Sequence, residues 1–563
     1  MANLPWNGRQ RFAHAPSKNW IGLTAGLIAP IAMALISFAA SAQASSLMYR
    51  GGPTLDGSSS GNISLPLSVL WKYTSDPTPN NPSSVTVSGG VVYYGCGKRI
   101  FAVKADTGAM LWRYPTDAPM STVINGTPAL DAGTLFIGTE SGRLLALNAA
   151  NGNVNWEYDV SGGIGGSPIV DNGVVYFGSG NGKLYAVDAK TGNPMPGWKS
   201  GFTAGDEISG APAVANGFVY AISLDQVLHA ISATTGLERW YIRLPASVLH
   251  ISPVVSGDRL YCASGSNLYC FLAQSGARLW MVTMPADIAS TPTINSHGLY
   301  VVTTDDKVYA FDPSRGNPLW HAAASLHYDT SAPATVSGRL LFMGTDQGVL
   351  YAIDTTTGQI KWSYLINPSA LNANQVPTYA SIAAPPVVSD NTLFIVSDDG
   401  TLTAFTNSAN YSSMPPRISD LIPEMGTVIN GTPPIKISAK IVDYGSGVDP
   451  ESVVLSLDGH ALPKRPSGFN NQDKPGYHYE MLTGVIKYET PVTQPIRPLA
   501  DGRHIITVTA KDWAGNSITK SWSFVVDNSL SRQAPEPQNR RNRYPGYPGY
   551  PGGSGMPGMP NRR

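Results

Sequence analysis

Polar side chains that could do chemistry recur in one sequence context, the few residues before a pair made of a small residue and proline. Three are the carboxylates Glu207, Asp287 and Asp329, which suit a cation such as Ca²⁺ or the role of a general base. We expect them to line one central funnel together with five further residues, namely Asn125, His250, His327, Tyr328 and Tyr379. The alternative is that the carboxylates bind solvent and turn amides, and that the histidines are ordinary loop residues. No residue is therefore assigned as catalytic or as a metal ligand.

The three cysteines predict neither a zinc site nor a disulfide scaffold, because they are few and lack ligand spacing. Cys262 and Cys270 flank a short turn between two expected strands. A disulfide and two free thiols both fit this spacing, since the register of the strands cannot be read from the sequence. Cys96 stays free in either case.

Composition excludes one class of partner. The 563 residues include 38 basic and 38 acidic side chains, so the formal net charge is zero, and only 13% of the residues are charged. Nucleic-acid affinity comes mainly from neutralising phosphates with Lys and Arg. We therefore expect no nucleic-acid partner.

The N-terminus has the organisation of an export signal. Arg9, Arg11 and Lys18 precede an apolar stretch that starts at Trp20 and ends in small residues at Ala44. This pattern predicts a signal peptide over residues 1–44, with an uncleaved membrane anchor as the alternative, and a flexible lead over 45–62. No second apolar run is long enough to span a bilayer, so the mature chain is expected in the periplasm, at the cell surface or outside the cell.

Eight tryptophans repeat along the chain with gaps of 40 to 44 residues. They are Trp71, Trp112, Trp156, Trp198, Trp240, Trp280, Trp320 and Trp362. Seven of them follow a turn that carries glycine, at Gly108, Gly152, Gly192, Gly236, Gly276, Gly316 and Gly358. A residue repeated in every unit answers a problem that every unit shares, so we predict that these rings dock adjacent units rather than stack on a ligand.

Each unit reads as four short strands: one after the small-Pro pair, two joined by a tight turn, and one that carries the tryptophan. Four strands at a period of about 40–45 residues are typical of β-propeller blades. The last unit, which includes Leu393–Val396 and Thr401–Phe405, has no glycine turn and no tryptophan, whereas Trp71 has no preceding unit. An N-terminal strand that completes the last blade uses both, which predicts one closed eight-bladed propeller over residues 63–408.

The segment from Ala352 to Trp362 has the form Ala-x-Asp-x-x-Thr-Gly-x-x-x-Trp and resembles the repeat of the PQQ-like β-propeller superfamily, where PQQ is pyrroloquinoline quinone. The resemblance implies one of two kinds of protein. Quinoprotein dehydrogenases enclose the quinone between a vicinal-cysteine disulfide ring and a tryptophan, and hold Ca²⁺ with Glu, Asn and Asp. Non-catalytic members include the propeller lipoprotein of the outer-membrane β-barrel assembly machinery.

This sequence departs from the dehydrogenase pattern. It has no Cys-Cys pair, and its four tryptophans outside the repeat lie near the N-terminus or in the C-terminal part, at Trp6, Trp20, Trp513 and Trp522. No tryptophan is left to support a quinone. We therefore expect no cofactor, with PQQ and Ca²⁺ as the alternative.

The repeat ends near Asn410. We predict a linker over 409–416, an immunoglobulin-like domain over 417–527, and a disordered Pro/Gly/Arg-rich tail over 528–563. The predicted fold class is all-β, an eight-bladed β-propeller followed by an immunoglobulin-like β-sandwich.

The predicted function is that of an exported, non-enzymatic binding or scaffold protein. Its expected partner is an envelope or extracellular protein, with a polysaccharide as the alternative. A PQQ-dependent periplasmic dehydrogenase and a saccharide-binding surface protein are the competing hypotheses.

Overall fold

The computed structural model describes residues 45–59, 61–75, 82–124, 126–246, 251–366, 380–407, 413–465 and 475–531. The predicted signal peptide, residue 408 of the predicted propeller, residues 409–412 of the expected linker and residues 532–563 of the expected tail lie outside these ranges. The described part is all-β, with two short 3-10 turns, η1 (Tyr49–Gly51) and η3 (Pro450–Ser452). Within it, no helix is long and apolar enough to cross a membrane.

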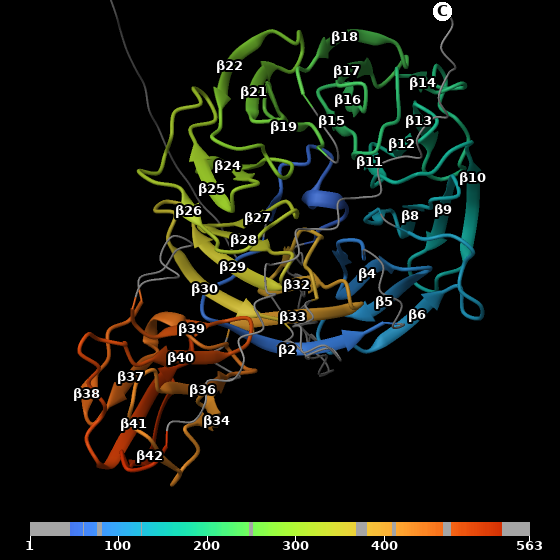
Figure 1. Ribbon diagram of the computed structural model, residues 1–563. Helices are drawn as coiled ribbons and strands as arrows, with labels where there is room; N and C mark the ends of the chain where they lie inside the picture. Colours follow the sequence, from blue (N-terminus) through green and yellow to red (C-terminus); the bar gives the residue numbers. More distant parts are fainter. Residues whose placement is uncertain are drawn as a thin grey trace, which may run out of the picture. The chain divides into compact units, whose positions relative to one another are not determined.

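Eight sheets follow one another along the chain from β2 to β33 and surround a common centre (Figure 1). We number the sheets along the chain from the one that begins with β3 (sheet 1) to the one that begins with β31 (sheet 8), and we leave the added strands β1 and β2 out of the numbering. In sheets 2 to 8, the first strand is the one that follows the small-Pro pair, and in sheet 1 it is β3. Sheets 1 to 4 contain β3 (Thr86–Ser88), β4 (Val91–Cys96), β5 (Arg99–Lys104), β6 (Met110–Tyr114); β7 (Ala129–Asp131), β8 (Thr134–Gly138), β9 (Arg143–Asn148), β10 (Val154–Asp159); β11 (Ile169–Asp171), β12 (Val174–Ser179), β13 (Lys183–Asp188), β14 (Phe202–Thr203); and β15 (Ala213–Ala215), β16 (Phe218–Ser223), β17 (Val227–Ser232), β18 (Glu238–Arg243).

Sheets 5 to 8 have the same order, and two of them also include a strand from the N-terminal end of the chain. They contain β19 (Val254–Ser256), β20 (Arg259–Ser264), β21 (Asn267–Leu272), β22 (Arg278–Thr283); β23 (Thr293–Asn295), β24 (Gly298–Thr303), β25 (Lys307–Phe311), β26 (Ala324–Ser325); β27 (Thr335–Ser337), β28 (Leu340–Gly344), β29 (Val349–Asp354), β30 (Ile360–Leu365) with β1 (Ser58–Ser59); and β31 (Val387–Ser389), β32 (Thr392–Val396), β33 (Thr401–Asn407), β2 (Leu67–Thr74).

Burial follows the position of a strand within its sheet. The second strands, such as β12, are buried along almost their whole length, because neighbouring sheets cover both of their faces. Outer strands such as β18 instead alternate between exposed and half-buried residues. The core therefore lies between the sheets.

The N-terminal strand β2 completes sheet 8. It pairs antiparallel with β33, and Trp71 lies opposite Ala404. This pairing is the one that the sequence predicts. It protects an edge strand that would otherwise expose unpaired amide and carbonyl groups.

Two of the eight tryptophans do not lie on strands, which corrects the prediction of a tryptophan strand in every unit. Trp198 and Trp320 precede the short strands β14 and β26. In both units a proline, Pro194 or Pro318, follows the glycine turn and forms only an isolated bridge with the third strand. Proline has no amide hydrogen to donate, so the ladder between the third and fourth strands lacks one hydrogen bond at this point.

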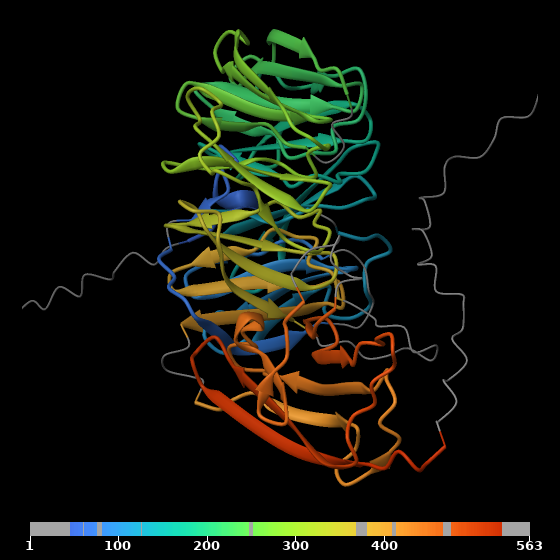
Figure 2. The same cartoon turned by 60° about the vertical axis from the view of Figure 1, so that its left-hand side comes forward.

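Residues 45–59 and 61–62, for which the sequence predicts a flexible lead, make a series of backbone hydrogen bonds to the sheets. The carbonyl groups of this segment accept hydrogen bonds of 2.7–2.9 Å from the first strands of six sheets, donated by the amides of Val87, Leu130, Val214, Val255, Ile294 and Val336. Each first strand is the inner edge of its sheet, so these amides have no partner within the sheet. Figure 2 shows the segment (blue) on one face of the ring.

Arg50 fixes this segment from within. Its side chain is almost fully buried and donates to Leu55 O at 2.9 Å and to Thr293 Oγ1 at 3.1 Å. Leu55 itself is completely buried. The segment is thus part of the core of the ring.

The C-terminal region contains two further sheets around a core that includes Trp522 and Phe524. Their strands are β34 (Arg417–Ile422), β36 (Lys436–Val442), β40 (Val485–Glu489) and β39 (His478–Glu480), and β35 (Val428–Ile429), β42 (Ser517–Val526), β41 (Gly502–Lys511), β37 (Val454–Leu457) and β38 (His460–Ala461).

Candidate functional site

The loops before the small-Pro pairs lie at one end of the sheets, which we call the mouth. Each of these loops bridges two neighbouring sheets through backbone hydrogen bonds. In the loop between sheets 3 and 4, Ile208 N donates to Ser179 O of sheet 3, and Leu224 N of sheet 4 donates to Glu207 O at 2.9 Å. The loop between sheets 5 and 6 makes the same two bonds. The backbone carbonyl oxygen of Asp287 accepts from Thr304 N at 2.8 Å, and Ile288 N donates to Gly265 O.

This repeated bridge gives the three predicted carboxylates equivalent places. The carbonyl groups of Glu207, Asp287 and Asp329 each accept from a residue that lies 17 positions later, in the hairpin between the second and third strands of the next sheet. Their backbones are therefore held, whereas their side chains are half-buried or exposed. Of the other predicted funnel residues, Asn125, His250 and Tyr379 lie outside the described residues.

His327 and Tyr328 occupy the loop that also contains Asp329. His327 is exposed and has a left-handed backbone, with φ of +66°. Tyr328 is half-buried and packs against the apolar cluster of sheets 6 and 7.

Four half-buried carboxylates follow one another along sheets 6, 7 and 8, and three of them were not singled out from the sequence. Asp306, Asp346 and Asp398 lie in the hairpins between second and third strands, next to Asp329. Gln347 Nε2 donates to Asp329 Oδ2 at 3.3 Å, and Ser331 Oγ donates to Asp346 Oδ1 at 2.8 Å.

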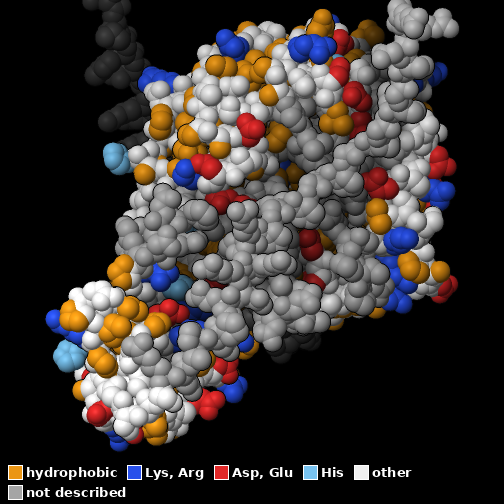
Figure 3. All heavy atoms as spheres, in the orientation of Figure 1, with side chains coloured by type: hydrophobic (Ala, Val, Ile, Leu, Met, Phe, Trp, Pro, Cys, Tyr) orange, Lys and Arg blue, Asp and Glu red, His pale blue; other side chains and the backbone are white. Residues whose placement is uncertain are grey.

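The carboxylates of this acidic row influence one another. Burial, with the neighbouring charge of Asp329, raises the pKa of Asp306 to about 6. Burial, with the charge of Asp346, likewise raises the pKa of Asp398 to about 6. In Figure 3 some acidic side chains (red) lie near the middle of the face in view and others near its edge, whereas the basic ones (blue) lie mainly towards the edge.

Acidic residues do not fill every equivalent place of the mouth. At the hairpin position of Asp346 and Asp398, sheet 2 carries Glu140, whereas sheets 3, 4 and 6 carry Gly180, Leu224 and Thr304. Among the described residues, no group of three His, Cys, Asp or Glu side chains is placed to hold a metal ion. The acidic row gives this part of the mouth a negative electrostatic potential.

A serine, a histidine and a glutamate in sheet 4 have the connectivity of a hydrolase triad. His229 Nε2 lies 3.1 Å from Ser223 Oγ, and His229 Nδ1 lies 2.7 Å from Glu238 Oε1. Sequence reasoning missed this cluster, because its members are 6 and 9 residues apart in an ordinary repeat.

Its position favours a structural role. Ser223 is completely buried, and its hydroxyl group donates to Asp225 in the turn that follows. Other sheets place a serine or threonine at the same end of the second strand, as at Ser179, Thr303 and Ser397. A substrate cannot reach a fully buried hydroxyl group, so we assign the cluster to the fold.

The repeated tryptophans lie at contacts between neighbouring sheets, which we call joints. For the first seven of them, the indole Nε1 donates to a carbonyl oxygen of the next sheet at 2.8–3.2 Å. A Cβ atom added to the glycine of that sheet's turn would lie only 2.5–3.3 Å from the ring. The eighth, Trp362, has a different acceptor, Ser446 O.

The residues present do not fit the quinone cage of the dehydrogenases. All ten described tryptophans donate their indole N–H to backbone carbonyls, including Trp513 and Trp522. The cysteines are free, and Cys262 lies opposite Tyr269 rather than Cys270. This offset of one residue points the two thiols to opposite faces of the sheet. Burial raises the pKa of both thiols.

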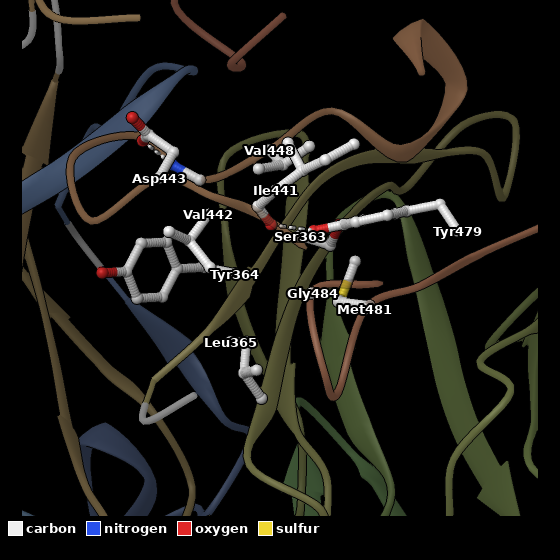
Figure 4. A pocket seen from close by; sticks show the side chains of 11 residues that line it. Ser363, Tyr364, Leu365, Ile441, Val442, Asp443, Val448, Tyr479, Met481 and Gly484 are labelled. Atoms are coloured by element: carbon white, nitrogen blue, oxygen red, sulfur yellow. Dashed lines mark hydrogen bonds between the residues drawn. The ribbon is translucent and has the colours of Figure 1, made fainter. Parts of the chain in front are cut away.

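One cavity lies between β30 and the C-terminal region (Figure 4). Its lining includes Tyr364, Asp443 and Tyr479, and its volume is about 40 Å³. A volume of this size has room for a few water molecules. It is therefore a gap in a contact rather than a site for a cofactor.

Comparisons with known proteins agree on the fold. A family model described as outer membrane protein assembly factor BamB matches residues 64–195, 196–272 and 250–420. BamB of Shewanella oneidensis is 24% identical over 340 residues, which cover 60% of this chain and 64% of that protein. The quinoprotein alcohol dehydrogenase PedH of Pseudomonas putida is 41% identical over only 81 residues, which are 13% of this chain and 14% of PedH.

Among solved structures, the quinohemoprotein alcohol dehydrogenase of Comamonas testosteroni is similar with a TM-score of 0.52 and 14% identity, over 68% of this chain and 83% of that one. At this identity the likeness concerns the fold alone. The chain spans less than two thirds of the length of the BamB and PedH relatives.

Proposed function

Because this chain belongs to the PQQ-like β-propeller family whose model is described as outer membrane protein assembly factor BamB, we propose that it is an exported, non-enzymatic scaffold that binds another protein of the cell envelope. The match of that model across residues 64–420 is the observation that carries the proposal. The matches to quinoprotein dehydrogenases in sequence are local by comparison.

The proposal includes an architecture. Residues 1–44 are a signal peptide, residues 63–408 are one closed eight-bladed propeller fastened by its tryptophan joints, and residues 417–527 are an immunoglobulin-like domain followed by a flexible tail. The eight successive sheets, the β2–β33 pairing and the two C-terminal sheets support it.

We assign the partner-binding face to the mouth. Its loops carry different side chains in different sheets. The joints, which together we call the rim, instead repeat the same tryptophan and glycine. The acidic row of Asp306, Asp329, Asp346 and Asp398 favours a partner with a basic surface. The N-terminal segment occupies the opposite face, where it covers the first strands.

Site-specific photocrosslinking in intact cells tests this function. A photoreactive residue in place of Asp329 at the mouth is expected to capture one envelope protein. The control position is Leu237, which directly precedes the outer strand β18. It is 67% exposed and is expected to capture no envelope protein. Replacement of Asp306 and Asp346 by asparagine should reduce the capture at least about five-fold, since charged groups at the border of an interface steer association. Equal capture from both positions, or none from the mouth, would contradict the proposal.

The second candidate is a PQQ-dependent dehydrogenase, which the local match to PedH favours. It predicts that the exported chain, supplied with PQQ and Ca²⁺, oxidises alcohols in the presence of an electron-accepting dye. We expect no turnover above that of a heat-denatured sample. Saturable quinone binding with turnover would replace the scaffold proposal.

A further inference from the structure

Sheet 8 differs from the other sheets in how its strands are connected along the chain. Its third strand, β33, and its fourth strand, β2, come from opposite ends of the ring, so no turn joins them. In sheets 1 to 7 this turn carries the glycine on which the tryptophan of the preceding sheet stacks. Trp362, on β30 of sheet 7, therefore has no glycine turn of sheet 8 to stack on.

A loop of the C-terminal region occupies that place. Trp362 is completely buried, and its indole Nε1 donates to Ser446 O at 3.1 Å. The next residue, Gly447, has a φ of +85°, and a Cβ atom added there would lie 3.0 Å from Tyr364 Cδ2. The loop thus supplies the carbonyl acceptor and a glycine of positive φ, as the seven glycine turns do, but this glycine lies against Tyr364 rather than against the tryptophan ring.

Asp443 organises this loop as aspartates organise glycine turns. Its Oδ1 accepts from the amides of Gly445 at 3.0 Å and Gly447 at 2.7 Å. In the glycine turn of sheet 7, Asp354 Oδ1 accepts from the amides of Thr356 and Thr357, both at 2.9 Å. Both loops are thus closed by a carboxylate that binds amides two to four residues later.

The loop also contacts both sheets that meet at this joint. Val69 N of β2 donates to Gly445 O at 3.3 Å, which reaches sheet 8. Trp513 Nε1 donates to Ser363 O of β30 at 2.9 Å, and Trp513 N donates to Gly447 O. Figure 4 shows Ser363 and Tyr364 of β30 close to Asp443.

We propose that residues 443–447 are the missing eighth glycine turn, supplied by the C-terminal region. The edge formed by Trp362, Ser363 and Tyr364 is its docking surface. The C-terminal region is then a closing part of the ring rather than an independent appendage. This inference does not depend on what the mouth binds.

Hydrogen exchange in the full-length chain provides the test, with two glycines of the C-terminal region as a matched pair. Gly447→Ala introduces a Cβ atom against Tyr364, whereas Gly515 has a φ of +90° and open space around its Cβ position. Both substitutions strain the backbone, but only the first disturbs the joint. We expect amide exchange in β30 and β2 to accelerate about ten-fold in the Gly447→Ala protein and to stay unchanged in the Gly515→Ala protein. Equal exchange in the two proteins would overturn the proposal.

A double-mutant cycle keeps the test decisive if one variant folds poorly. Trp362→Phe removes the indole donor, so Gly447→Ala should add little to its effect. Trp320→Phe removes the donor of a joint that has its own glycine turn, so Gly447→Ala should add its full effect there. The proposal predicts that the coupling between the two substitutions, expressed as a factor in the unfolding equilibrium constant, differs about five-fold between the two cycles. Additive effects in both cycles would contradict it.

Discussion

The rim and the mouth of the propeller are built from the same repeat but use it in different ways. At the rim, seven tryptophans meet seven glycines with one geometry, and the indole bonds differ by no more than 0.4 Å (2.8–3.2 Å). At the mouth, the repeated backbone bridge presents Glu207, Asp287 or Asp329 at one equivalent position. Repetition of side chains thus marks what the fold requires, and variation on a repeated backbone marks where function can differ.

The largest effect is expected at the rim. Trp198 is 1% exposed and donates to Ala233 O at 2.8 Å. Trp198→Ala should lower the free energy of unfolding by about 3–5 kcal/mol, because it leaves a cavity and an unpaired carbonyl group. Urea unfolding measures this loss. Glu207→Gln, in the next mouth loop, should change stability by less than about 0.5 kcal/mol. A comparable loss in the two variants would erase the distinction between rim and mouth.

An intermediate effect separates glycines that face a ring from glycines that only turn the chain. Gly152 and Gly133 both belong to sheet 2, with φ of +74° and +78°. A Cβ atom on Gly152 would lie 2.6 Å from the Trp112 ring, whereas nothing lies within 4 Å of one on Gly133. Gly152→Ala should therefore cost about 1–3 kcal/mol more than Gly133→Ala. Equal midpoints of thermal unfolding would show that the ring is free to move aside.

The smallest effect is expected at the mouth and depends on pH. The pKa of Asp398 is raised to about 6 in the folded chain, so this group contributes stability that is fully present below about pH 4 and is lost as the pH rises through about 6. Asp398→Asn removes the ionisation. The variant should thus unfold at a higher temperature than the parent at pH 7.5, with the difference shrinking towards pH 4. A stabilisation by Asp398→Asn that is as large at pH 4 as at pH 7.5 would show that charge is not its cause.

Much of the ring could be predicted because its determinants repeat. The spacing of Trp71 to Trp362 locates the units. Because no unit precedes Trp71 and the last unit has no tryptophan, the sequence also predicts that the Trp71 strand pairs with the last unit. The mouth was predicted less well. Glu207, Asp287 and Asp329 were found because they precede a small-Pro pair, whereas Asp306, Asp346 and Asp398 lie in hairpins that look like ordinary polar turns.

The course of residues 45–62 could not be predicted for a related reason. Their serines, glycines and prolines suggest a flexible chain, and what holds them is a set of amides on strands about 40 to 280 residues away. No local pattern reports such partners.

The sequence by itself determined the repeat, the number of tryptophans and the tight glycine turns, because side-chain periodicity and positive φ act within a few residues. Only the tertiary structure decided which carboxylates lie close enough to raise one another's pKa, why the Ser223 hydroxyl group is buried, and which carbonyl group accepts the hydrogen bond of Trp362. Those outcomes depend on groups that are distant along the chain and become neighbours only when the ring closes.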